Sequence, residues 1–203
     1  MIKVILFDVD GVVLKLEKMS TRYKRHLKDR YGISEEDLNP FFEHQFNKCL
    51  VGKADFLEEL TKFLKEKDSP EKVKELMYFM FKNEEFVDKR IIQLAQQLRA
   101  KGIKCCLATN QEKYRLKSLL LKDLKLDNLF DQIFASCEIG HKKPEDAFYQ
   151  AIMDSLKGVE KSEVLFFDNE EPNIAGANKF GIKSFVYNDF ETFKWELAEN
   201  GID

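Results

Sequence analysis

The stretch MIKVILFDVDGVV, residues 1–13, decides the fold of this 203-residue chain. Its branched apolar run, Ile2 to Phe7, leads into Asp8 and Asp10, which predicts a buried strand that ends in a turn. Side chains two apart on a strand point the same way, and a turn at Gly11 lets both carboxylates face one pocket. Two carboxylates this close repel each other unless a cation or a proton lies between them. A simple turn or helix cap would use the same residue types, but delivery to a sheet edge by a buried strand favours a functional pair.

Four further apolar runs have the length and composition of strands, and helical patterns lie between them. This alternation predicts an α/β fold, a Rossmann-like parallel sheet of about five strands with helices on both faces. We expect the further strands at Ile103–Ala108, Gln132–Ala135, Val164–Phe167 and Ser184–Tyr187, and helices at Gln111–Leu124, Pro144–Leu156 and Asn173–Phe180.

Residues 15–88 depart from this alternation, because they contain amphipathic helical patterns and no convincing strand. Pro40 and Pro70, each after a polar residue, predict helix starts within this segment. We therefore expect a small all-helical domain at 15–88, inserted after the first strand into a core made of residues 1–14 and 89–203.

The composition narrows the classes of partner. The chain carries 33 basic and 36 acidic residues, a net charge of −3, so we expect no binding to nucleic acid. An anionic substrate would then need a local positive site. The apolar start is too short to cross a membrane and lacks the features of a signal peptide, so we expect no membrane association. The four cysteines show no metal-ligand spacing, which favours reduced thiols and a cytoplasmic protein.

Four motifs follow one another along the chain: FDVDGV at 7–12, LATN at 107–110, GHKKP at 140–144 and FFDNEEPNI at 166–174. Together they resemble the motifs of the haloacid dehalogenase (HAD) superfamily, with three at strand ends and one opening a helix. The resemblance spans the whole chain, and the helical insertion lies where this family inserts a cap domain.

The resemblance implies a magnesium-dependent phosphatase of a small phosphorylated metabolite, with a sugar phosphate as one candidate. Asp8 would attack phosphorus and form an acyl phosphate, and Asp10 would protonate the leaving oxygen and then activate water. Mg²⁺ would lie between the Asp8 carboxylate, the Asp10 carbonyl and a phosphate oxygen. Thr109 and the Asn110 backbone N–H would bind the phosphoryl group, and Lys143 would neutralise its charge. Taken alone, Thr109 would be a hydroxyl that caps a strand, and Lys143 a surface lysine.

Two positions refine this reading. Dehalogenating relatives carry tyrosine at the position of Asp10, and aspartate suits an oxygen leaving group, so dehalogenation is disfavoured. Relatives commonly carry an aspartate as a direct metal ligand where this chain has Asn169. An amide oxygen can bind magnesium but lacks the full charge, so we expect weaker metal binding, with Asp168 as a further ligand, directly or through water.

Lys53 follows a glycine in the insertion, in a segment similar to a turn of related caps, and either reaches substrate or begins a solvated helix. A phosphomutase or phosphotransferase would use the same catalytic residues. A third hypothesis is a weakly active or non-catalytic binding protein of this fold. The amide at Asn169 favours that hypothesis, and the intact set of catalytic residue types opposes it.

Overall fold

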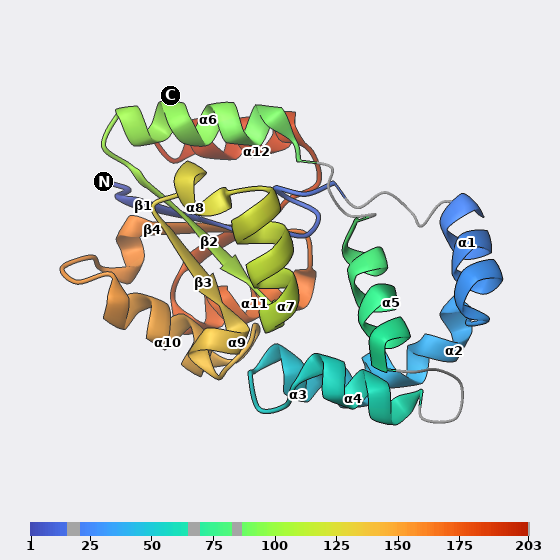
Figure 1. Ribbon diagram of the computed structural model, residues 1–203. Helices are drawn as coiled ribbons and strands as arrows, with labels where there is room; N and C mark the ends of the chain where they lie inside the picture. The colour runs from blue at the N-terminus through green and yellow to red at the C-terminus, as the bar shows by residue number, and fades with distance from the viewer. Residues whose placement is uncertain (16–20, 65–69, 83–86, 203) are drawn as a thin grey trace.

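The structure is a computed structural model that describes residues 1–15, 21–64, 70–82 and 87–202 (Figure 1). Five parallel strands form one sheet in the order β3-β2-β1-β4-β5. Phe7 of the middle strand lies opposite Leu107 on one side and Phe167 on the other. The prediction of a five-stranded parallel sheet is confirmed. The strands are β1 (Val4–Phe7), β2 (Lys104–Thr109), β3 (Gln132–Ala135), β4 (Val164–Asp168) and β5 (Lys183–Val186).

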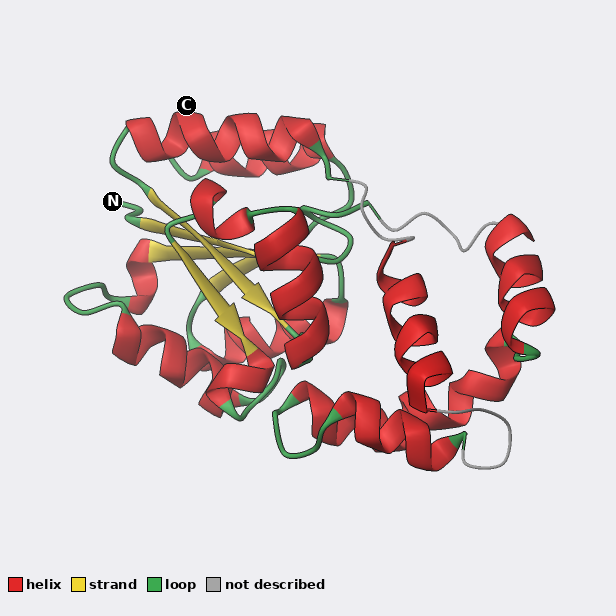
Figure 2. Cartoon of the chain, viewed as in Figure 1, coloured by secondary structure: helices red, strands yellow, loops and turns green. Residues whose placement is uncertain are grey.

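Helices cover both faces of the sheet, because the side chains of the strands alternate between two hydrophobic clusters (Figure 2). Ile5 and Phe7 pack with residues of α6, η2 and α12, whereas Val4 and Leu6 pack with residues of α10 and α11. Burial on both faces explains why the strands are apolar almost throughout. The core helices are α6 (Lys89–Ala100), α7 (Lys113–Arg115), the π-helical η2 (Leu116–Asp123), α8 (Leu126–Leu129), α9 (Ser136–Ile139), α10 (Asp146–Ser155), η3 (Lys161–Glu163), α11 (Glu171–Phe180) and α12 (Phe190–Glu199).

The described part of the insertion is helical and has a hydrophobic cluster of its own. Phe41 lies in this cluster, with its ring centroid 5.6 Å from that of Phe56 and 5.5 Å from that of Phe63. In Figure 1 the helices of the insertion lie to the right of the sheet. They are α1 (Thr21–Tyr31), α2 (Glu35–Pro40), the π-helical η1 (Phe41–Gln45), α3 (Phe46–Leu50), α4 (Phe56–Phe63) and α5 (Pro70–Lys82).

The chain leaves the core and rejoins it at neighbouring points. Leu14 pairs with Val87 in an antiparallel bridge, and the N–H of Asp88 donates to the carbonyl of Val13 at 2.8 Å. The domain boundaries expected from sequence, after residue 14 and before residue 89, lie next to the paired residues Leu14 and Val87. The division into two domains at these points stays a prediction.

Polar contacts join the insertion to the core near the carboxyl ends of the strands. Ser136 Oγ donates to the carbonyl of Leu50 at 2.6 Å. Asp55, the N-cap of α4, accepts from Lys113 Nζ at 2.6 Å and from the Tyr114 hydroxyl at 2.9 Å. The insertion is therefore docked on the edge of the sheet to which the motifs lead.

Pro40 does not begin a helix, contrary to the expectation from sequence. Helix α2 begins earlier, because Ser34 and Asp37 form a reciprocal cap in which each side chain accepts from the other's backbone N–H. Pro40 is the last residue of α2, and the π-helical η1 follows it. Proline has no N–H to continue the regular hydrogen-bond ladder, which accounts for the change of helix type at this point.

Pro144 also lies outside the helix that it was expected to begin, since α10 starts at Asp146. The backbone at Gly176 of α11 approaches Pro144 so closely that a Cβ there would lie 2.6 Å from the proline Cβ. The proline packs against a neighbouring helix, and such tertiary packing leaves no signal in local sequence.

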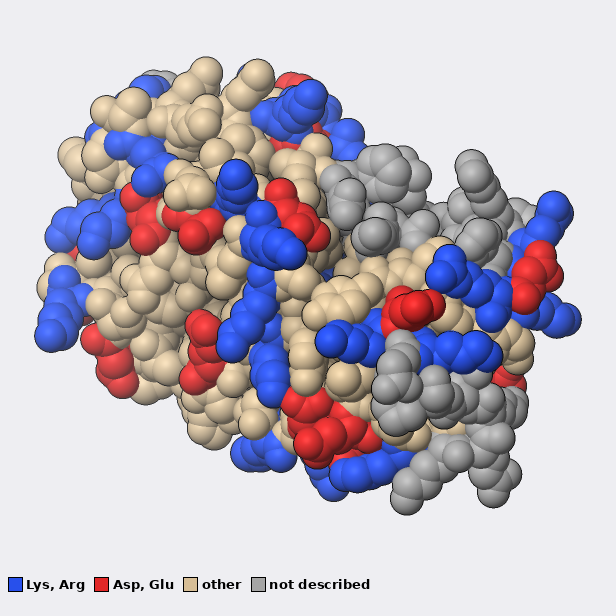
Figure 3. Space-filling model, viewed as in Figure 1, with Lys and Arg blue, Asp and Glu red and all other residues tan. Residues whose placement is uncertain are grey.

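Basic and acidic side chains are interspersed over the face in Figure 3, so no broad region of one sign dominates that face. An anionic substrate therefore depends on local groups at its site. No helix in the described ranges is both long and apolar enough to span a membrane. The cytoplasmic location stays a prediction.

Candidate active site

Three parallel strands deliver polar side chains to one edge of the sheet. Asp8 follows β1 directly, Thr109 ends β2 and Asp168 ends β4. The backbone N–H of Asp8 donates to the carbonyl of Phe167 at 2.9 Å, which extends the β1–β4 ladder to this residue. The carboxyl ends of parallel strands are where open α/β sheets bind ligands.

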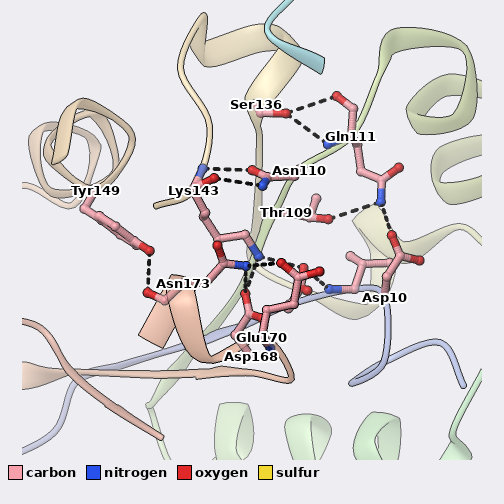
Figure 4. A network of polar contacts seen from close by, with 12 residues as sticks. Asp10, Thr109, Asn110, Gln111, Ser136, Lys143, Tyr149, Asp168, Glu170 and Asn173 are labelled. Atoms are coloured by element: carbon pink, nitrogen blue, oxygen red, sulfur yellow. Dashed lines mark hydrogen bonds and ion pairs between the residues drawn. The ribbon is translucent and has the colours of Figure 1, made fainter. Parts of the chain in front are cut away.

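Lys143 lies between two of these carboxylates. Its ammonium is 2.9 Å from Asp8 Oδ1 and 2.6 Å from Asp168 Oδ2, and the residue is only 2% exposed (Figure 4). The amide of Asn110 fixes the lysine loop, since it donates to the Lys143 carbonyl at 3.1 Å and accepts from the Lys143 N–H at 2.9 Å. Asp8 Oδ1 also accepts from the N–H of Val9 at 2.7 Å. Lys143 is thus a buried cation beside Asp8 and not a surface lysine.

The charges of this cluster shift one another's pKa values. Burial raises the pKa of Asp8 to about 7, with the Lys143 ammonium opposing the rise and the charges of Asp168 and Asp10 adding to it. Burial works against the charge on Lys143, but the carboxylates of Asp8 and Asp168 outweigh it and hold the pKa of the lysine above its ordinary value. A divalent cation near Asp8 would favour its ionised form.

Asp168 is held by donors on both carboxylate oxygens. Oδ1 accepts from the N–H of Glu170 at 2.8 Å, and Oδ2 accepts from Lys143 and from Asn173 Nδ2 at 3.0 Å (Figure 4). The Tyr149 hydroxyl donates to the carbonyl of Asn173 at 2.8 Å. This arrangement orders the loop and the lysine, and it makes Asp168 a weaker candidate for direct metal binding. The role of Asp168 as a metal ligand stays a prediction.

Asp10 is clamped by two side chains that the sequence did not single out. Arg115 Nη2 donates to Asp10 Oδ1 at 2.6 Å, Nη1 donates to Oδ2 at 3.0 Å, and Gln111 Nε2 also donates to Oδ2 at 2.6 Å. Gln111 reaches Thr109 Oγ1 at 3.2 Å as well, so the predicted phosphoryl ligand and the predicted acid/base share one network (Figure 4). The signal in the sequence was a glutamine and an arginine four apart, directly after the second motif.

The amide oxygen of Asn169 is a donor of the kind that a hard cation accepts. In the described part of the chain Asn169 Oδ1 is buried and has no hydrogen-bond partner. Its side chain lies against Gly11, where a Cβ would be 2.6 Å from Asn169 Cγ. No group of three or more His, Cys, Asp or Glu residues that could hold a metal occurs among the described residues. The predicted magnesium ligands are the Asp8 carboxylate, the Asp10 carbonyl and the Asn169 amide, all oxygen donors that Mg²⁺ accepts, and this ligand set stays a prediction.

Two cavities lie between the insertion and the core. One, of about 390 Å³, is lined by Asp10, Arg115 and apolar side chains of the insertion. The other, of about 280 Å³, is lined by Lys53 together with Asp55 and Lys113. Of these two cavities, Lys53 lines the second and not the one that reaches Asp10, and its contact with substrate stays a prediction.

The sequence model of the haloacid dehalogenase-like hydrolases matches residues 2–181. The chain belongs to the haloacid dehalogenase-like hydrolases. Among relatives of this HAD hydrolase, a phosphatase from Mycobacterium tuberculosis is 27% identical over 195 residues, which cover 91% of this chain and 87% of the relative. Bifunctional epoxide hydrolase 2 of Rattus norvegicus is 28% identical over 116 residues, or 56% of this chain. The match spans only 21% of that longer protein.

Solved structures of the family share the fold of this HAD hydrolase. A HAD-family enzyme from Bacteroides thetaiotaomicron, solved in complex with magnesium and inorganic phosphate, superposes with a TM-score of 0.78. It is 18% identical, and the alignment covers 96% of this chain and 99% of the other. At this identity the likeness establishes the fold alone.

Proposed function

We propose that this HAD hydrolase is a magnesium-dependent phosphatase that acts on a small phosphorylated metabolite through an aspartyl-phosphate on Asp8. The observation that carries the proposal is the setting of Asp8. Its carboxylate is nearly buried at the end of the middle strand, with Oδ1 fixed by a backbone N–H and by the ammonium of Lys143. A positioned carboxylate beside a buried cation suits attack on an anionic phosphoryl group. The phosphatase from Mycobacterium tuberculosis, similar over nearly its whole length, supports the same class of reaction.

The reaction has two steps. An Asp8 oxygen bonds to phosphorus, the bond from phosphorus to the ester oxygen breaks, and Asp10 gives its proton to the leaving alcohol. Water then attacks the acyl phosphate while Asp10 takes a proton from it, which releases inorganic phosphate and restores the Asp8 carboxylate. Thr109 and Lys143 stabilise the charge on the transferring group. Because Asp10 accepts from Arg115 on both oxygens, proton transfer to the leaving oxygen requires this clamp to loosen.

The Asp8 carboxylate, the Asp10 carbonyl and the Asn169 amide would hold the magnesium ion. When bound, Mg²⁺ would offset the repulsion between the carboxylate nucleophile and the phosphate. The amide of Asn169 supplies an oxygen without a charge, so we expect binding to be weaker than with a carboxylate at this position. The magnesium and phosphate complex of the Bacteroides thetaiotaomicron enzyme supports this choice of metal.

Phosphate release from an aryl phosphate, with and without Mg²⁺, tests the proposal. We expect magnesium-dependent release by the wild type and none by Asp8→Asn, which removes the nucleophile and changes little volume. Asp154→Asn is the matched control, because it makes the same atomic change on an exposed residue of α10. Turnover by Asp8→Asn at the rate of the control would refute the covalent mechanism.

The same assay separates the other hypotheses. A phosphotransferase or phosphomutase would release little phosphate, and would instead transfer the phosphoryl group to an added acceptor alcohol or sugar phosphate to form a new ester. A binding protein that lacks activity would release none, yet would still bind inorganic phosphate with magnesium. The buried amide oxygen of Asn169 is the observation that keeps this last hypothesis in the comparison.

A further inference from the structure

The cavity of about 390 Å³ has an aromatic wall supplied by the insertion. The ring centroids of Phe42 and Phe46 are 5.2 Å apart with an interplanar angle of 76°, and those of Phe46 and Phe56 are 5.2 Å apart at 63°. Met80 and Phe81 of α5 extend the same wall. Aromatic rings favour such edge-to-face contacts at centroid distances of about 4.5–7 Å, so a further ring from a ligand would continue this packing.

The polar residues that the core contributes to this cavity are already hydrogen-bonded, and the insertion adds only Glu35 and Asn39 to the polar lining described. Arg115 and Gln111 both bind Asp10, as described above. Glu112 accepts from two backbone N–H groups of α7, and the amide of Asn110 is bonded to the main chain of the lysine loop. The hydroxyl groups of a sugar would leave water and find few partners here, which is unfavourable. This cavity therefore disfavours a polyhydroxylated ligand.

The charged residues that line the cavity limit how many anionic groups a ligand can carry. Among the described residues that line it, Arg115 is the only basic one, and its guanidinium is bound to Asp10 and Gln111. The acidic side chains of Glu35 and Glu112 line the cavity as well. A second phosphate or a carboxylate on the ligand would meet repulsion without a cation to offset it.

We propose that the substrate is a phosphate monoester of an apolar alcohol that carries an aromatic ring and no second anionic group. This inference rests on the proposed phosphatase function, because the cavity reaches Asp10, the residue that would protonate the leaving alcohol. With the ester oxygen at Asp10, the rest of the alcohol extends along the wall of Phe42 and Phe46. The volume lies at the lower end of the roughly 300–1,000 Å³ typical of small-ligand sites, which suits a compact leaving group. The cavity thus favours an aryl or arylalkyl ester over a sugar phosphate.

Steady-state kinetics on two esters test the proposal. We expect kcat/KM for 1-naphthyl phosphate to exceed that for glucose 6-phosphate by about tenfold or more, since the polar ester leaves groups unpaired in the cavity. Equal values, or a preference for glucose 6-phosphate, would overturn the substrate class and leave the phosphatase function intact. If neither ester releases phosphate, the phosphatase function fails. Calorimetry then measures how tightly the wild-type protein binds each ester. The cavity remains assigned to an aromatic ligand only if 1-naphthyl phosphate binds more tightly than glucose 6-phosphate.

A variant of the aromatic wall links the preference to this cavity. Phe42 is 37% exposed, so Phe42→Ala removes a ring from the cavity without emptying the interior of the insertion. We expect it to lower kcat/KM for 1-naphthyl phosphate by roughly three- to tenfold, and that for glucose 6-phosphate by less. Trp195→Ala is the matched control, since this side chain is 58% exposed on α12 and does not line the cavity. An equal loss on both esters, or a loss with Trp195→Ala as large as with Phe42→Ala, would contradict the proposal.

Discussion

The ion pair between Asp10 and Arg115 gives a prediction that stability measurements can test without knowledge of the substrate. The two charged hydrogen bonds are 2.6 Å and 3.0 Å long, and the side chains are 33% and 10% exposed. Exposed ion pairs contribute about 0.2–1 kcal/mol, and loss of one partner from a fully buried pair costs about 3–5 kcal/mol. The Asp10–Arg115 pair is more buried than an exposed ion pair and less buried than a fully buried one, and both of its hydrogen bonds are short. We therefore expect a coupling free energy of about 2 kcal/mol, roughly a thirtyfold change in the unfolding equilibrium.

A double-mutant cycle isolates this free energy. Urea unfolding of the wild type, Asp10→Asn, Arg115→Met and the double variant measures it, and the cycle cancels the contact that Arg115 makes with Gln111. The pair of Arg30 and Glu75, 3.2 Å apart with side chains 56% and 60% exposed, is the internal reference, and its coupling should be below about 0.5 kcal/mol. If the coupling free energy of Asp10 and Arg115 is no larger than that of the reference pair, the ion pair does not hold Asp10 as described.

Three further predictions address the same edge of the sheet. Asn169→Asp should lower the magnesium concentration for half-maximal phosphate release by about tenfold, because it adds a charge to the ligand set, and an unchanged titration would place residue 169 away from the metal. Gly11→Ala should lower the free energy of unfolding in urea more than Gly140→Ala does. Both positions have φ near +85°, but only at Gly11 does the new Cβ meet the side chain of Asn169. Equal losses of stability in the two variants would contradict this prediction. Burial raises the pKa of Glu112 from 4.5 to about 7, so the folded state holds more protons than the unfolded state between these values, and stability falls as pH rises through them. Glu112→Gln should therefore gain stability relative to the wild type between about pH 5 and pH 8, and melting temperatures that differ by a constant amount would refute the assignment.

Sequence was sufficient for the elements whose signals are local. Asp8 and Asp168 could be placed at one sheet edge because each follows a buried apolar run, and such runs predict parallel strands. Arg115 could not be placed at the site, since its partner Asp10 lies 105 residues earlier and only the tertiary fold brings the two together. The same limit applies to Pro144, whose position depends on a close approach by a helix from elsewhere in the chain. Local patterns thus predict which side chains reach the edge, but not which of them bind one another there.

The central position of β1 has a consequence for how the protein fluctuates. Val4–Phe7 are hydrogen-bonded to a strand on each side and are fully buried, so their amide hydrogens should exchange with solvent only when the whole sheet opens. The insertion has a separate hydrophobic cluster, so we expect it to open at a lower free energy, without loosening the strand that holds Asp8. Hydrogen exchange should then divide the molecule into a slow centre and a faster insertion. Asp8 would remain in place while the entrance to the candidate site opens and closes.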